Sequence, residues 1–152
     1  MNLIMSKEYI HIIIPGEPTA QGRPKFSTKG GFVKAYDPAK SRDYKALLKL
    51  IAIDEGKKQE WRFRDKEPLC ISIIAKFPIA KTKSKKFRQA ALERKEMPTK
   101  RPDTDNIIKI VQDAFQGILY KEDSQFVMSQ CVKVYSVEPC VEVTISEWNT
   151  DI

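Results

Sequence analysis

The sequence has few of the residues that build disulfide frameworks or zinc sites. Its three cysteines, Cys70, Cys131 and Cys140, are odd in number and include no Cys-x-x-Cys spacing, so neither kind of site is expected. They are expected to be small core or surface residues in a reducing compartment. The only histidine, His11, lies in a β-branched run, where a lone histidine is more often packed or half-exposed than catalytic.

Long apolar runs are also missing. No stretch is long enough to span a bilayer, and the N-terminus does not read as a signal peptide. We therefore expect a cytoplasmic protein acting at the nucleoid, without a membrane partner. The 152 residues contain no repeat or low-complexity tract, and 31% of them are charged, which predicts one globular domain over residues 1–152.

Acidic residues are outnumbered, with 20 Asp and Glu against 27 Lys and Arg. A net charge of +7 favours an anionic partner, and nucleic acid more than membrane. The excess falls within residues 79–102, which hold nine basic and two acidic residues. A short helix capped by Ser84 and running to about Met97 is predicted there. The side chains expected to contact DNA are Lys81, Lys83, Lys85, Lys86, Arg88, Lys100 and Arg101. A solvated surface is the alternative.

A second candidate DNA contact lies in residues 18–36, which are rich in glycine and proline. Basic residues, among them Arg23 and Lys25, alternate there with the aromatic residues Phe26, Phe32 and Tyr36. Such a hairpin could offer cations to phosphates and rings to exposed bases. Equally, it could be a solvated loop whose aromatic residues pack into the core.

Residues 101–125 gather five acidic residues in a chain that is otherwise strongly basic. This stretch contains Asp103, Asp105, Asp113, Glu122 and Asp123. Hard cations such as Mg²⁺ prefer oxygen ligands and usually take one or two protein carboxylates. The stretch is therefore the best candidate for a divalent-metal site.

Most of this stretch is predicted to be an amphipathic helix of about four turns, which ends near Gly117. Asp105, Lys109 and Asp113 fall on one face, because each follows the last by four residues. A separate face gathers apolar residues for the core: Ile107, Ile108, Val111, Ala114, Phe115 and Ile118. A structural alternative exists, since Asp103 or Asp105 could cap the helix and the Asp-Lys-Asp row could form surface ion pairs.

The order and spacing of these residues resemble the RusA family of Holliday-junction resolvases. That family carries (K/R)-P-D-x-D-N-x-x-K, then D-A-x-x-G, then D-D-x-Q. Residues 101–109 read RPDTDNIIK, residues 113–117 read DAFQG and residues 122–125 read EDSQ. Glu122 replaces the first Asp of the last motif, while Asp123 matches the second, which the family is held to use in catalysis. Residues 16–26 also resemble the family's G-x-P-x-x-x-x-R-P-(R/K)-F segment.

The resemblance implies an Mg²⁺-dependent endodeoxyribonuclease, with Mn²⁺ as a candidate substitute and no small-molecule cofactor. Its metal ligands would be Asp103, Asp105 and Asp123, and Lys109 would contact the scissile phosphate or the leaving oxygen. Supporting roles would fall to Asn106, Asp113 and Glu122; Asp113 could join the ligands or only orient Lys109. The implied partners are branched DNA, in particular a four-way junction, and a second copy of the chain in a homodimer that makes paired nicks.

Two other functions fit the same residues. One is a broader metal-dependent nuclease acting on flaps or forks. The other is a non-catalytic DNA-binding module in which the acids only cap the helix and form ion pairs.

The expected fold is α/β or α+β, a mixed β-sheet with helices packed on it, as in RusA. Strands are predicted at residues 9–14, 69–77, 126–135 and 141–148, the last two joined by a turn. A further helix is predicted from Pro38 to about Glu55, capped by Asp37. Its core face would contain Tyr44, Leu47, Leu48, Ile51 and Ala52.

Overall fold

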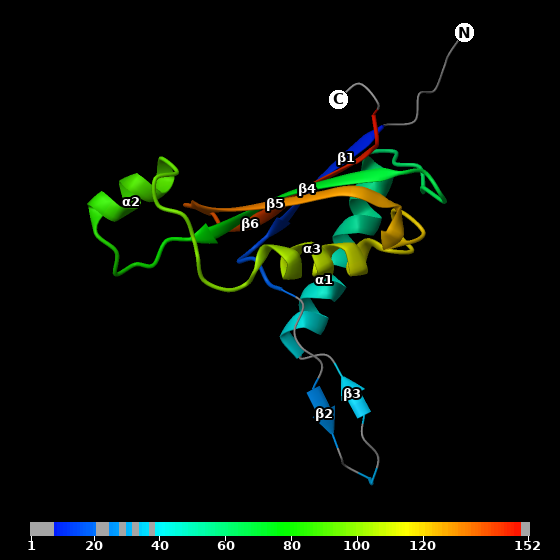
Figure 1. Ribbon diagram of the computed structural model, residues 1–152, viewed down its shortest axis with the longest axis horizontal. Helices are drawn as coiled ribbons and strands as arrows, with labels where there is room; N and C mark the ends of the chain where they lie inside the picture. The colour runs from blue at the N-terminus through cyan, green and yellow to red at the C-terminus, as the bar shows by residue number, and fades with distance from the viewer. Residues whose placement is uncertain (1–7, 21–24, 28–29, 32–33, 37–38, 150–152) are drawn as a thin grey trace.

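The computed structural model describes residues 8–20, 25–27, 30–31, 34–36 and 39–149. A mixed four-stranded sheet, in the order β1-β6-β4-β5, carries α1 and α3 on one face (Figure 1). The expected α+β arrangement is confirmed. No helix within these ranges is long and apolar enough to cross a membrane. The sheet strands are β1 (Tyr9–Pro15), β4 (Leu69–Pro78), β5 (Phe126–Ser136) and β6 (Cys140–Glu147). The helices are α1 (Ala39–Lys58), α2 (Lys85–Leu92) and α3 (Thr104–Phe115), with a 3₁₀ turn η1 (Asp123–Gln125).

The predicted strands are all present, but their order was not foreseen. β6 runs antiparallel to both β1 and β4, whereas β4 and β5 are parallel. The last two strands follow each other in the chain, yet β4 lies between them. β6 is therefore a central strand, and its residues Val141, Val143 and Ile145 are fully buried.

The core lies between the sheet and the two helices. α3 contributes its apolar face, of which Ile107, Ile110, Val111, Ala114 and Phe115 are buried. α1 contributes a narrower stripe than expected: Tyr44, Leu48 and Ala52 are buried, but Leu47 is 38% exposed. The prediction for Leu47 was wrong because α1 buries positions four residues apart, and Leu47 lies beside that stripe.

α2 lies at one end of the sheet, away from α1 (Figure 1). Ser84 caps it as predicted, accepting a hydrogen bond from the backbone N–H of Phe87 at 3.1 Å. The helix ends at Leu92, so the expected end near Met97 was wrong. The chain turns at Arg94, whose φ is +67°, and the Lys95 N–H donates to the Ala90 carbonyl at 2.8 Å. This bond closes the helix, as left-handed terminations do.

A short hairpin, β2 (Lys25–Ser27) with β3 (Lys34–Tyr36), projects beyond the N-terminal end of α1 (Figure 1). The expected hairpin is therefore confirmed at the level of the backbone. The DNA contact proposed for it is a separate matter: Arg23 lies outside the described residues, as does the side chain of Lys25. The predicted helix cap Asp37 and first residue Pro38 also lie outside them.

Candidate active site

The N-terminal end of α3 presents two exposed carboxylates. Asp103 occupies the N-cap position with an extended backbone, φ −75° and ψ 155°, but its side chain makes no capping hydrogen bond. Asp105 is exposed in the first turn. Asn106 is half-buried beside them. The capping role that offered a purely structural explanation for Asp103 is therefore not taken up by its side chain.

The polar face of α3 was also expected, as an alternative to a metal site, to form surface ion pairs, and the described residues form none there. Asp105, Lys109 and Asp113 are on one face, as predicted, since all three belong to the same continuous helix. Within the described residues, none of the three takes part in an ion pair. Lys109 is exposed and Asp113 is half-buried. These charges are available to a ligand.

The C-terminal end of α3 holds the other two carboxylates, Asp113 and Asp123. The chain leaves the helix at Gln116, whose side-chain oxygen accepts a hydrogen bond from the Asp123 N–H at 3.3 Å. The nearby Tyr120 is buried, and its hydroxyl donates to the Gln112 carbonyl at 2.5 Å. Burial raises the pKa of Tyr120, and the negative charges of Asp123 and Asp113 raise it further. Both carboxylates therefore act on the same buried hydroxyl.

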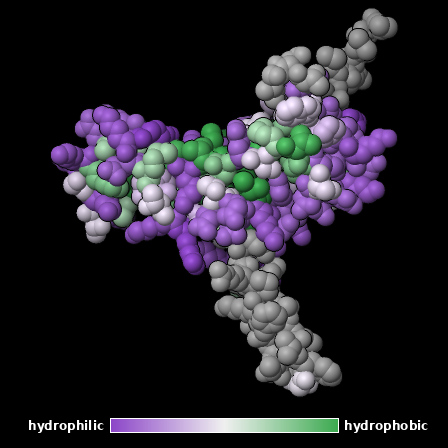
Figure 2. Space-filling model, viewed as in Figure 1, coloured by the Kyte–Doolittle hydropathy of each residue, from purple (hydrophilic) through white to green (hydrophobic). Residues whose placement is uncertain are grey.

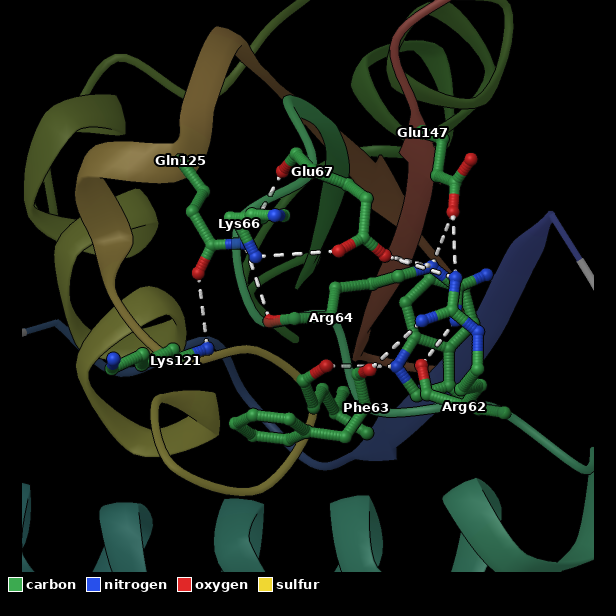
Figure 3. Close-up of polar contacts among 10 residues, drawn as sticks. Arg62, Phe63, Arg64, Lys66, Glu67, Lys121, Gln125 and Glu147 are labelled. Atoms are coloured by element: carbon green, nitrogen blue, oxygen red, sulfur yellow. Dashed lines mark hydrogen bonds and ion pairs between the residues drawn. The ribbon is translucent and has the colours of Figure 1, made fainter.

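Gln125 fixes the segment that carries Asp123. Its side-chain oxygen accepts from the N–H groups of Lys121 at 3.0 Å and Glu122 at 2.8 Å. Its side-chain nitrogen donates to the carbonyls of Arg64 and Glu67, each at 3.2 Å (Figure 3). Glu122 completes a capping box with Gln125, so its observed contacts are structural. Gln125 stood in the quoted motif, but its anchoring role was missed.

Arg64 supports this segment from beneath and was also missed. It is completely buried, with Nε 2.5 Å from a Glu147 oxygen and 3.6 Å from a Glu67 oxygen (Figure 3). Its guanidinium lies 4.0 Å from the centre of the Trp61 ring. Its backbone N–H donates to Leu119 and its carbonyl accepts from Lys121. One of 27 basic residues, Arg64 carries no local sequence signal of burial.

The carboxylates of one chain are thus divided between the two ends of α3. The eight residues from Asp105 to Asp113 correspond to about 12 Å along a helix axis, and Asp123 lies with the Asp113 end. Among the described residues, no three Asp, Glu, His or Cys side chains are grouped so that they could hold a metal ion. The donor chemistry suits a hard cation, but the arrangement in a single chain does not. No catalytic step through a metal follows from one chain.

The basic segment reaches the N-terminal end of α3. Its lysines Lys81, Lys83, Lys85, Lys86 and Lys100, together with Arg101, are exposed, and Arg88 is half-buried. Arg88 donates to the Ala80 carbonyl at 3.1 Å, and Lys83 lies over the Phe87 ring at 4.7 Å. The Lys133 ammonium donates to the Lys100 carbonyl at 2.6 Å, which ties the end of the segment to β5. Lys100 and Arg101 shortly precede Asp103 in the sequence, whereas α2 lies farther from α3 (Figure 1).

Comparison with known proteins shows the family of the chain. The family described as Endodeoxyribonuclease RusA matches residues 15–146. The chain belongs to the RusA family. The match includes α3, η1 and the whole basic segment, so the resemblance seen in four short segments extends over most of the protein.

One curated relative gives the same extent of similarity. The chain is 38% identical over 138 residues to "Uncharacterized protein YqaN" of Bacillus subtilis (strain 168), covering 91% of this chain and 96% of that protein. RusA is a family of endodeoxyribonucleases, and membership of this family supports nuclease activity. The individual roles of Asp103, Asp105, Lys109 and Asp123 remain predictions.

Proposed function

We propose that this RusA-family protein is a metal-dependent endodeoxyribonuclease that resolves four-way DNA junctions by paired symmetric nicks. The observation that carries the proposal is the polar face of α3. Asp105, Lys109 and Asp113 form no ion pair with any described residue, and the Asp103 side chain makes no capping bond. Structural acids at a helix start are normally used as caps or in ion pairs. The acids of α3 do neither within the described part of the chain, which favours a role with a ligand.

Lys109 is the proposed contact to the DNA phosphate at the point of cleavage. It follows Asp105 by one helical turn on the same face and is exposed. A cation at this place would stabilise negative charge that develops on the leaving oxygen. Asn106 would assist by hydrogen bonding at the start of the helix.

The basic segment is proposed to hold the DNA backbone. Its exposed lysines contact phosphates independently of base sequence, and its last two residues, Lys100 and Arg101, directly precede Asp103. A backbone bound along this segment is therefore delivered to the N-terminal end of α3. The projecting β2–β3 hairpin, with Lys25 and the preceding Arg23, is proposed as a second contact.

The proposed cofactor is Mg²⁺, with Mn²⁺ as a candidate substitute, and the proposed ligands are Asp103, Asp105 and Asp123. Since one chain separates these residues, the proposal needs the homodimer. If a twofold partner places its α3 antiparallel to the first, the Asp123 end of one helix meets the Asp103 end of the other. Two equivalent sites then result, which suits symmetric nicking.

The test is cleavage of an end-labelled four-way junction with and without Mg²⁺, using wild type and Asp105→Asn, with binding followed by gel shift. We expect symmetric nicks that need the metal and fall by at least about 100-fold in the variant, while binding is retained. Asp54→Asn is a matched control, because Asp54 is also exposed but pairs with Lys58 on α1. It should cut like wild type.

Each alternative gives a different result. A non-catalytic module would bind the junction without cutting it and would ignore Mg²⁺. A broader nuclease would cut flaps or forks as well as the junction when both compete in one reaction. Equal cleavage by wild type and Asp105→Asn would reject the assigned site.

A further inference from the structure

A pocket of about 410 Å³ is formed by the C-terminal half of α1, the segment that follows it and the turn after α3. The proposed metal ligands are not among its lining residues. Apolar and aromatic side chains make up most of the lining: Ala52, Ile53, Trp61, Phe63, Ile118 and Leu119. This volume and this kind of lining are typical of pockets that bind an organic ligand.

Trp61 is a fixed wall of the pocket. Its indole N–H donates to the Leu119 carbonyl at 2.9 Å. The guanidinium of the buried Arg64 lies 4.0 Å from the centre of its ring. A ring that is already held by two contacts loses little conformational freedom when a ligand packs against it. Trp61 is therefore preorganised for contact with a ligand.

Phe63 and Ile53 leave part of the lining uncovered. They are 42% and 45% exposed, respectively, and the Phe63 ring points away from the Arg62 and Glu147 side chains (Figure 3). Exposed apolar side chains are common when they are scattered singly over a surface, but here they share one pocket with a fixed aromatic ring. Their arrangement indicates a binding surface for an apolar group.

Two exposed charged residues, Lys57 and Glu60, also line the pocket. Lys57 forms no ion pair with a described residue, whereas its neighbour Lys58 pairs with Asp54 at 2.9 Å. An unpaired lysine in an apolar pocket suits a ligand that joins an apolar group to an anion. A nucleotide is such a ligand, because it joins a base to a phosphate.

We propose that the pocket binds an unstacked base of the DNA substrate, with the base against Trp61 and Phe63 and its phosphate at Lys57. The chain belongs to a family of endodeoxyribonucleases, and the apolar group that DNA offers is a base. Aromatic side chains stack on any base, because every base has a π-face. The inference rests on the proposed function, since bases at a branch point can lose a stacking neighbour, which lowers the cost of unstacking them.

Arg64 connects the pocket to the segment that carries Asp123. Its guanidinium lies against Trp61, and its backbone N–H donates to the Leu119 carbonyl at 3.1 Å. Its own carbonyl accepts from the N–H of Lys121 at 3.0 Å, two residues before Asp123. A base bound in the pocket would therefore be held in a fixed relation to that segment. Binding there would position the branch point of the DNA for cleavage.

Tryptophan fluorescence of the full chain tests the pocket. Trp148→Phe leaves Trp61 as the one tryptophan of the sequence. A four-way junction is titrated into this variant with a chelator present, so that no metal-dependent cleavage occurs, and an unbranched duplex with the sequence of two arms is the second probe. At equal occupancy, measured by gel shift, the junction should quench the fluorescence of Trp61. The duplex, whose bases stay stacked, should leave it unchanged.

Substitutions of Phe63 separate base stacking from general apolar contact. Phe63→Leu keeps an apolar side chain without the ring and should weaken junction binding by about 10-fold. Phe63→Tyr keeps the ring and should bind the junction like wild type. Tyr9→Leu is the matched control, because Tyr9 is a 52% exposed aromatic residue on β1, outside the pocket; it should leave binding unchanged. Circular dichroism shows whether each variant is folded.

Three results overturn the proposal: no quenching by the junction, equal quenching by junction and duplex, or junction binding by Phe63→Leu equal to that of wild type. Both readouts measure binding and neither needs cleavage. Quenching of Trp61 in a protein that cuts no junction counts only against the proposed function. A metal-dependent junction nuclease in which Trp61 is not quenched counts only against the pocket.

Discussion

The two ends of α3 carry the same kind of side chain in opposite settings. At the N-terminal end, Asp103 and Asp105 are exposed, and their side chains make no hydrogen bond or ion pair with the described residues. At the C-terminal end, Asp123 belongs to a segment fastened by Gln125, Tyr120 and buried Arg64. One end thus has carboxylates with no side-chain partner among the described residues, and the other has a carboxylate in a segment that hydrogen bonds hold in place. Substitutions at the two ends should accordingly separate activity from stability.

The largest effect on stability is expected from Arg64→Met. The change removes the buried guanidinium that pairs with Glu147 and Glu67; because Glu147 is 33% exposed and keeps Arg62 at 3.5 Å, we expect a loss of about 3 kcal/mol, the lower end of the range for a broken buried ion pair. Urea unfolding followed by circular dichroism measures it. Arg62→Met is the control, because Arg62 pairs with Glu67 but is 54% exposed; it should lose at most about 1 kcal/mol. Equal losses of unfolding free energy in the two variants would show that Arg64 does not anchor the segment that carries Asp123.

Gln125→Ala should have the next largest effect and should act on both properties. It removes the partner of the Glu122 N–H and of the Glu67 carbonyl, whereas the Lys121 N–H keeps the Arg64 carbonyl; the loss should be about 2 kcal/mol of unfolding free energy. Junction cleavage should also fall, because Asp123 loses its fixed position, while DNA binding should persist. Gln130→Ala is a suitable control, since Gln130 makes one exposed hydrogen bond to Ser72. Normal cleavage by Gln125→Ala would show that the hydrogen bonds of Gln125 are not needed to position Asp123 for cleavage.

Tyr120→Phe should be milder and should change the response to pH. Loss of the hydroxyl bond to Gln112 should cost about 1 kcal/mol near neutral pH. The folded-state pKa of Tyr120 is raised above its ordinary value of 10.0 by burial and by Asp123 and Asp113. The native state therefore keeps a proton that the unfolded state loses, and stability falls as pH rises above about 10. The phenylalanine variant should show a smaller fall in urea unfolding at alkaline pH.

The smallest change in stability is expected at the N-terminal end of α3. Asp105→Asn should alter the unfolding free energy by no more than about 0.5 kcal/mol, the size of a helix-dipole contribution at an exposed site. Thermal unfolding of the same samples used for cleavage gives the comparison. A loss above about 2 kcal/mol would mean that Asp105 has a structural role which its exposed position does not indicate.

The sequence predicted the helices and strands well. Hydrophobic periodicity, and the proline and glycine residues that bound an element, are both properties of a short stretch of chain. α3 begins after Pro102 and ends before Gly117, as expected, although its 12 residues make slightly over three turns where four were predicted. Strand order was missed because the alternation in residues 141–147 indicates a strand but not its neighbours. The exposure of Leu47 was missed for a similar reason, since helical spacing does not show how wide the buried stripe is.

For the site, the sequence indicated the residues but not their separation. Asp103, Asp105 and Asp123 are close in sequence, yet a rigid helix lies between the first two and the third. Arg64 and Gln125 act through contacts that join segments some 60 residues apart in the chain, for instance the bond from Gln125 to the Arg64 carbonyl. Such contacts have no periodic signature, so only the folded arrangement reveals them.

The small clamp formed by Gln59 on β1 has a consequence for the size of any assembly. A sheet with two adhesive edges can recruit copies at both sides and grow without limit into a fibre. In this protein the Gln59 side-chain amide accepts from the His11 N–H at 3.2 Å and donates to the His11 carbonyl at 2.6 Å, so a strand of another chain would have to displace it to pair with β1 at that residue. Gln59→Ala should therefore make this part of the edge available for pairing.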